Sequence, residues 1–121
     1  MNLRILLIED DAWLAESYAQ ILEKQGWIID YAAHAISAME RIDHAKPDVI
    51  FSDVLLAGPT AMALFNELQS HADTKDIPVI LCTNIADQLN QTDLAPYGVR
   101  RILDKATTEP DDLVAAIRSV I

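Results

Sequence analysis

The sequence predicts an α/β fold, a doubly wound five-stranded parallel sheet with helices on both faces. Short apolar runs recur five times along the chain, as expected for strands that are buried on both faces. A segment with helical spacing of apolar residues follows each run, and this alternation favours a parallel sheet. The chain of 121 residues is 51% apolar, which suits one packed domain spanning residues 1–121.

The first half of the chain contains three of these strands and two of the helices. Trp13 and Trp27 flank the first helix and are expected to be packing residues. Gly26 stands where a glycine commonly follows a helix. The strands are expected at 5–8, 27–29 and 49–51, and the helices at 12–25 and about 35–43.

The second half supplies the other two strands and three helices. The segment at about 86–95 is polar and only weakly predicts a helix. Pro110 occupies the first turn of the last helix, where its missing amide hydrogen is tolerated. The helices are expected at 61–70, about 86–95 and 110–121, and the strands at 79–82 and 98–103.

Charge and composition exclude several classes of function. Nine Lys and Arg against nineteen Asp and Glu give a net charge of −10, which disfavours binding to nucleic acid or to an anionic membrane surface. No apolar run approaches the roughly 20 residues that cross a bilayer. The single cysteine, Cys82, allows no internal disulfide and suits the reducing cytoplasm. The three glycines form neither a dinucleotide fingerprint nor a P-loop.

Chemically active side chains follow four of the expected strands. Glu9 and Asp10 follow the first strand, Asp53 the third, Thr83 the fourth and Lys105 the fifth. The carboxyl ends of parallel strands lie at one edge of a sheet, so these groups are expected to meet there. Mg²⁺ would relieve the repulsion between such carboxylates. A carboxylate nucleophile, a metal, a hydroxyl and an ammonium are the parts needed for phosphoryl transfer to Asp.

Simpler roles compete at each of these positions. Asp11 is expected to cap the following helix. Asp53 has no helix directly after it, and a lone buried Asp is costly without a partner. Lys105 is either an ordinary solvated lysine or the partner of Asp53 and later of a phosphoryl oxygen. Thr83 either caps the next helix or donates its hydroxyl to a phosphoryl group on Asp53.

Three segments and one lysine resemble the receiver domain of two-component response regulators, the CheY-like family. The segments are ILLIEDD at 5–11, PDVIFSD at 47–53 and IPVILCT at 77–83, and the lysine is Lys105. The likeness covers essentially the whole chain in order and spacing. It implies a flavodoxin-like sheet with strand order 2-1-3-4-5.

The resemblance also implies roles in phosphorylation and metal binding. Asp53 would be the phosphoacceptor. Asp10 and Asp53 would bind Mg²⁺ directly with the backbone carbonyl of Leu55, while Glu9 would reach the metal through water. These roles describe a phosphoprotein that acts as a switch, and not an enzyme with a released product.

In the same resemblance, Thr83 and Lys105 would hold the phosphoryl oxygens. The donor would be a phosphohistidine on a sensor histidine kinase or a phosphotransfer protein. The chain ends where the last helix of a receiver ends, so the signal would pass to a downstream protein partner or to an effector domain beyond it. The domain itself is expected to bind neither nucleic acid nor membrane.

The sequence departs from the family pattern on the output side. Ala106 replaces the usual proline after the lysine, so we expect a trans Lys105–Ala106 bond, because a non-proline cis bond costs roughly 2.5–4 kcal/mol. Ile102 replaces a common aromatic, and Arg100 and Arg101 replace common acidic residues. The chemical groups of the site remain in place.

Two other functions compete with a phosphorylatable receiver. One is a Mg²⁺-dependent aspartyl phosphohydrolase, but Leu55 stands where such an enzyme commonly needs a general acid. The other is a degenerate receiver that acts only as an interaction module, which the intact site disfavours. Cys82 is expected to be an inert core residue, and the three histidines, His34, His44 and His71, are expected to be surface residues.

Overall fold

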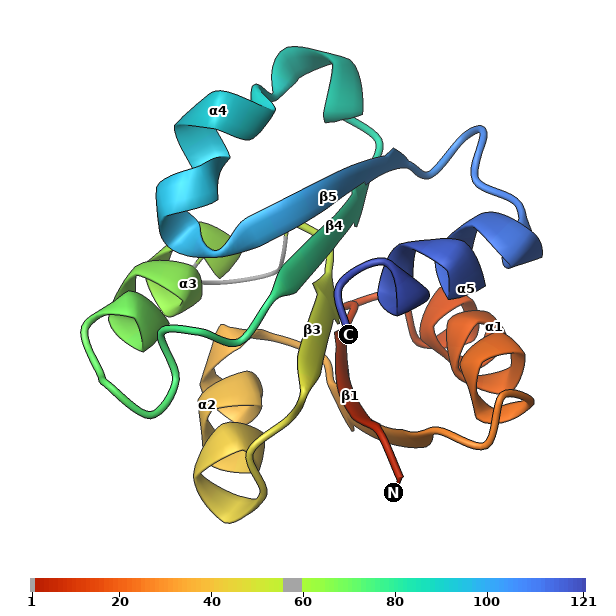
Figure 1. Ribbon diagram of the computed structural model, residues 1–121. Helices are drawn as coiled ribbons and strands as arrows, with labels where there is room; N and C mark the ends of the chain where they lie inside the picture. The colour runs from red at the N-terminus through yellow and green to blue at the C-terminus, as the bar shows by residue number, and fades with distance from the viewer. Residues whose placement is uncertain (1, 56–59) are drawn as a thin grey trace.

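A five-stranded parallel sheet forms the centre of the computed structural model, which describes residues 2–55 and 60–121. The strand order is β2-β1-β3-β4-β5 (Figure 1). Both the fold class and this order confirm the expectation from the sequence. The strands are β1 (Arg4–Ile8), β2 (Ile28–Ala32), β3 (Val49–Ser52), β4 (Val79–Thr83) and β5 (Val99–Asp104).

Helices cover both faces of this sheet (Figure 1). The first and last helices lie side by side on one face, and the other helices lie on the opposite face. The helices are α1 (Ala12–Glu23), α2 (Ala35–His44), α3 (Ala61–Gln69), α4 (Gln91–Leu94) and α5 (Pro110–Arg118), with short 3₁₀ turns η1 (Ala86–Gln88) and η2 (Ala95–Tyr97). No helix in the described residues is long and apolar enough to cross a membrane.

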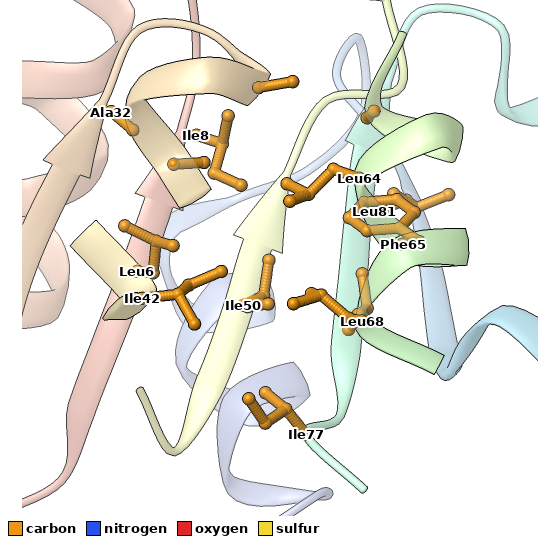
Figure 2. Close-up of a cluster of buried hydrophobic side chains, with 14 of the residues drawn as sticks. Leu6, Ile8, Ala32, Ile42, Ile50, Leu64, Phe65, Leu68, Ile77 and Leu81 are labelled. Carbon is orange, nitrogen blue, oxygen red and sulfur yellow. The ribbon is translucent and has the colours of Figure 1, made fainter. Parts of the chain in front are cut away.

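The core consists of two layers of buried apolar side chains, because successive residues of a strand point to opposite faces. In β1, Leu6 and Ile8 pack toward α2 and α3 (Figure 2). Ile5 and Leu7 belong to the other layer, which includes Leu22 of α1 and buried residues of α5. Burying a side chain of this size contributes roughly 1.5–3 kcal/mol, so these layers hold the strand ends in place.

The second strand overlaps the expected 27–29 only at residues 28 and 29, since it begins at Ile28 and extends to Ala32. This strand lies at the edge of the sheet, where one side faces solvent and polar residues are tolerated. Asp30 lies within it and forms an ion pair of 2.7 Å with Arg4 of β1. The apolar run that marked the strand therefore covers only its beginning.

The expected helix at 86–95 is broken into three short pieces. Asn90 accepts hydrogen bonds from the amides of Thr92 and Asp93 and so starts α4 afresh. Pro96 has no amide hydrogen to continue that helix, and the chain tightens into η2. Local capping and proline chemistry thus override the weak helical pattern.

One expected packing residue is exposed. Trp13 retains 77% of its surface, whereas Trp27 packs at the edge of the core with Arg118 over its ring. The structure confirms that Asp11 caps α1, since its Oδ1 accepts from the Leu14 amide at 3.1 Å. Trp13 lies in the first turn of α1, and the buried residues of that helix are Ala15, Tyr18 and Leu22.

Candidate functional site

The carboxyl ends of β1, β3 and β5 bring together Glu9, Asp53 and Lys105. The Nζ of Lys105 lies 2.7 Å from the Oε1 of Glu9 and 2.7 Å from the Oδ2 of Asp53. Because β4 separates β3 from β5, only a long side chain can reach from the end of β5 to the acids. The structure therefore favours the paired reading of Lys105 over the solvated one.

Both carboxylates of this cluster are buried. Glu9 is 1% exposed and Asp53 is 6% exposed, and charges at such depth require a partner. Burial raises the pKa of Glu9, and the hydrogen bond from Lys105 only partly opposes that rise. Burial alone would lower the pKa of Lys105, but its hydrogen bonds to Asp53 and Glu9 outweigh that effect and raise the pKa.

The Asp53 carboxylate is held at both oxygens. Its Oδ1 accepts a hydrogen bond from the backbone amide of Leu55 at 3.1 Å, and its Oδ2 accepts from Lys105. The Asp53 amide donates to the carbonyl of Ile8 at 3.2 Å and ties the end of β3 to β1. The carboxylate thus has one orientation, which suits a group that must meet a second reactant.

The acidic turn, Glu9–Asp11, is tied down at several atoms. The Glu9 amide donates to the carbonyl of Ala32, and the Asp11 amide donates to the Oε2 of Glu9. Asp10 lies between them with its side chain exposed. The Tyr31 hydroxyl donates to the Glu9 backbone carbonyl at 2.8 Å. Sequence reasoning missed Tyr31, because only the register of β2 against β1 brings it to this turn.

Thr83 is buried at the end of β4, and it does not cap a helix. Its hydroxyl accepts a long hydrogen bond of 3.4 Å from the Ile85 amide, and its carbonyl accepts from the Lys105 amide at 3.1 Å. The Lys105–Ala106 bond is trans, as expected. The following loop is anchored by Asp104, whose Oδ1 accepts from the Ala106 amide.

The oxygen atoms of the site fit Mg²⁺. Within residues 2–55 and 60–121, no group of three or more His, Cys, Asp or Glu side chains is placed to hold a metal ion. Two direct carboxylate ligands would be enough for Mg²⁺, which usually takes one or two carboxylates and keeps several waters, so Asp10 and Asp53 remain the ligands expected from the sequence. The remaining protein donor would be the backbone carbonyl of Leu55, the residue whose amide already binds Asp53.

The histidines and the cysteine take no part in the site. His34 caps α2 through its Nδ1, and His44 and His71 are exposed. Cys82 is buried in β4, 3.6 Å from the Tyr18 hydroxyl, and burial raises the pKa of its thiol. These residues match the structural roles expected for them.

The family model and the similar proteins all belong to the same class of signalling protein. The sequence profile of the response regulator receiver domain matches residues 5–118. The phosphate regulon transcriptional regulatory protein PhoB of Klebsiella pneumoniae is 30% identical over 121 residues, which are 100% of this chain and 52% of PhoB. The chain thus spans about half the length of the curated relatives that it matches.

Two solved structures share the fold. A protein described as a response regulator from Chloroflexus aurantiacus J-10-fl is 27% identical and superposes with a TM-score of 0.86, over 99% of this chain and 98% of that one. The chemotaxis response regulator CheY4 of Vibrio cholerae is 20% identical, with a TM-score of 0.90 over 100% of both chains. The second likeness concerns the fold alone.

Proposed function

Since this chain belongs to the response regulator receiver domain family, we propose that it is a phosphorylatable module of two-component signalling and that Asp53 is its phosphoacceptor. The observation that carries this proposal is the setting of the Asp53 carboxylate. It is buried at the end of a central strand, oriented by the Leu55 amide and paired with Lys105 at 2.7 Å. A nucleophile that is oriented and charge-compensated in this way suits phosphoryl transfer.

In the proposed reaction, an Asp53 oxygen forms a bond to phosphorus while the bond from phosphorus to the donor's histidine nitrogen breaks. The electron pair of the broken bond stays on the imidazole, which takes up a proton, and Asp53 becomes an acyl phosphate. Lys105 already lies beside Asp53 and would offset negative charge on the phosphoryl oxygens. The Thr83 hydroxyl, from the next strand, would donate to one of them.

The proposed Mg²⁺ ligands are Asp10, Asp53 and the backbone carbonyl of Leu55, with Glu9 acting through water. When bound there, Mg²⁺ supplies positive charge that offsets charge on the phosphoryl oxygens. Glu9 is engaged by Lys105, which fits an indirect role. The orientation of the Asp10 backbone then matters, because its exposed side chain has to turn toward Asp53.

We further propose that residues 1–121 form one receiver domain that acts in the cytoplasm. Its donor would be a sensor histidine kinase or a phosphotransfer protein. Its output would be a downstream protein partner or an effector domain of a longer chain. The net charge of −10 argues against direct contact of this domain with nucleic acid.

The domain is proposed to be a switch and not an enzyme. An aspartyl phosphohydrolase would need a general acid near Asp53, and Leu55 offers an exposed apolar side chain there. A purely structural interaction module would have no use for two buried carboxylates that share one ammonium.

Labelling with acetyl phosphate and Mg²⁺ tests this function. Intact-mass analysis should show one added phosphoryl group on the wild type and on Asp43→Asn, an exposed control. Asp53→Asn should show none. Full labelling of Asp53→Asn would contradict the assignment, and sustained turnover of a phosphate ester would favour the phosphohydrolase.

A further inference from the structure

Tyr31 lies at an edge position where its hydroxyl would be expected to face solvent. Instead, the hydroxyl forms a hydrogen bond within the protein. The residue lies in the edge strand β2, opposite Leu7 of β1, and is 37% exposed. Its ring lines a small apolar cavity of about 170 Å³ beneath α1, together with Leu7 and alanines of α1. An edge tyrosine of this kind can bond water, but here the hydroxyl donates to the Glu9 carbonyl at 2.8 Å.

The Glu9 carbonyl depends on this hydrogen bond. It lies one residue beyond β1, after the last carbonyl of the strand ladder, and before α1 begins at Ala12. Among the residues that the structure describes, no backbone amide donates to it, and the Tyr31 hydroxyl is its protein donor. Without that hydroxyl, only solvent would hold the carbonyl.

Holding this carbonyl orients a whole peptide group. The peptide bond between Glu9 and Asp10 is planar, so the direction of the Glu9 carbonyl sets the direction of the Asp10 amide and the position of the Asp10 Cα, from which its side chain starts. The Glu9 amide is fixed separately by the Ala32 carbonyl, and the Glu9 side chain by Lys105. Tyr31 therefore restrains the part of the turn that the other contacts leave free, the link to Asp10.

The surroundings of the hydroxyl agree with this role. Burial raises the pKa of Tyr31, and the charges of Glu9, Asp10 and Asp11 raise it further. The charges of all three residues of the acidic turn, Glu9–Asp11, therefore act on the Tyr31 hydroxyl.

We propose that Tyr31 is a positioning residue for Mg²⁺ binding, whose hydroxyl holds the Glu9–Asp10 peptide in the orientation in which Asp10 binds the ion. This inference rests on the proposed function, since it requires Asp10 to be a metal ligand. Tyr31 touches neither the metal nor the phosphoryl group. It acts through the backbone of the acidic turn.

The test is a titration of the metal-free protein with Mg²⁺ alone. The readouts are the fluorescence of Trp13, three residues after Asp10, and the amide resonances of Asp10 and Asp11. The variant is Tyr31→Phe, which keeps a ring at the wall of the cavity and removes only the hydroxyl. The matched control is Tyr97→Phe, a half-buried tyrosine that packs against the core on the opposite face of the sheet.

We expect Tyr31→Phe to raise the Kd for Mg²⁺ by roughly two- to ten-fold, the range that one hydrogen bond spans. Tyr97→Phe should bind like the wild type. The Mg²⁺-induced rise in unfolding temperature should shrink in Tyr31→Phe alone, which a purely structural role would not produce. Equal Kd values for all three proteins would overturn the inference while leaving the proposed function intact. A wild type that does not respond to Mg²⁺ would overturn the proposed metal site, and the role of Tyr31 with it.

Discussion

The ammonium nitrogen of Lys105 lies 2.7 Å from the Oδ2 of Asp53, although the two residues are 52 positions apart in the sequence. The same nitrogen lies 2.7 Å from the Oε1 of Glu9. One cation thus pairs with two carboxylates at adjacent strand ends. We therefore expect both the stability of the metal-free protein and the proposed phosphoryl transfer to depend on the same contact.

Replacing Lys105 should destabilise the metal-free protein. Lys105→Met leaves two buried carboxylates without their cation, and loss of one partner from a buried pair costs about 3 kcal/mol. Urea unfolding in the presence of EDTA measures this loss. Lys24→Met, at an exposed position, should stay within about 0.5 kcal/mol of the wild type. Equal stability of Lys105→Met and the wild type would show that the ion pairs contribute nothing.

The stability that Glu9 contributes should fall as pH rises. Its pKa is raised above the ordinary value of 4.5 by burial, so the folded state holds a proton that the unfolded state has already lost. This contribution is complete below about pH 4.5 and is lost as pH rises through the folded-state pKa.

Urea unfolding of the wild type and Glu9→Gln in EDTA, at steps from pH 4.5 to 7.5, tests this direction. The stability of the wild type relative to Glu9→Gln should decline across the series. A relative stability that increases with pH would mean that pairing with Lys105 outweighs burial at Glu9.

The acyl phosphate should be long-lived, because Leu55 and Ile85 flank the reacting centre and cannot orient an attacking water. Leu55→Asn supplies a hydrogen-bonding group at an exposed side chain and leaves the backbone carbonyl in place. We expect it to speed loss of the phosphoryl group several-fold, in line with the free energy of about one hydrogen bond. Leu55→Met is the matched control and should hydrolyse at the wild-type rate. An unchanged rate in Leu55→Asn would show that side-chain polarity at this position does not limit hydrolysis.

Phosphorylation should not produce a symmetric dimer through α4, β5 and α5. Ile102 is half-buried against the core and is stiff at χ1, with no ring to move between two states. Arg100 and Arg101 are exposed on β5 and would repel their counterparts near a two-fold axis. Sedimentation should show the same oligomeric state with and without beryllofluoride. A tight dimer that forms only with beryllofluoride, and is lost on charge reversal at Arg101, would contradict this expectation.

The buried strands could be predicted from the sequence because their surroundings are uniform. β3 and β4 are covered on both faces, so an unbroken apolar run marks each within one or two residues. The edge strand β2 has solvent on one side. Asp30 and Tyr31 interrupt its apolar pattern, so hydrophobicity alone does not detect the second half of the strand. Trp13 was expected to pack against the core but is exposed. An aromatic side chain in an amphipathic helix does not by itself reveal which face it occupies.

The residue types of the site followed from their places at strand ends, but their contacts did not. The pairing of Lys105 with Asp53 was one of two readings, and its second contact with Glu9 depends on how the long side chain crosses β4. The bond from Tyr31 to the Glu9 carbonyl depends on the register between β2 and β1. Such contacts arise from tertiary geometry, which residue spacing does not encode.

Mapping the phosphorylated residue tests the central claim most directly. The protein is treated with acetyl phosphate and Mg²⁺ and then with borohydride, which reduces an aspartyl phosphate to homoserine, and the peptides are sequenced by mass spectrometry. The account predicts homoserine at position 53 and at no other acidic residue. Homoserine at position 10 with an unmodified Asp53, or no homoserine at all, would contradict it.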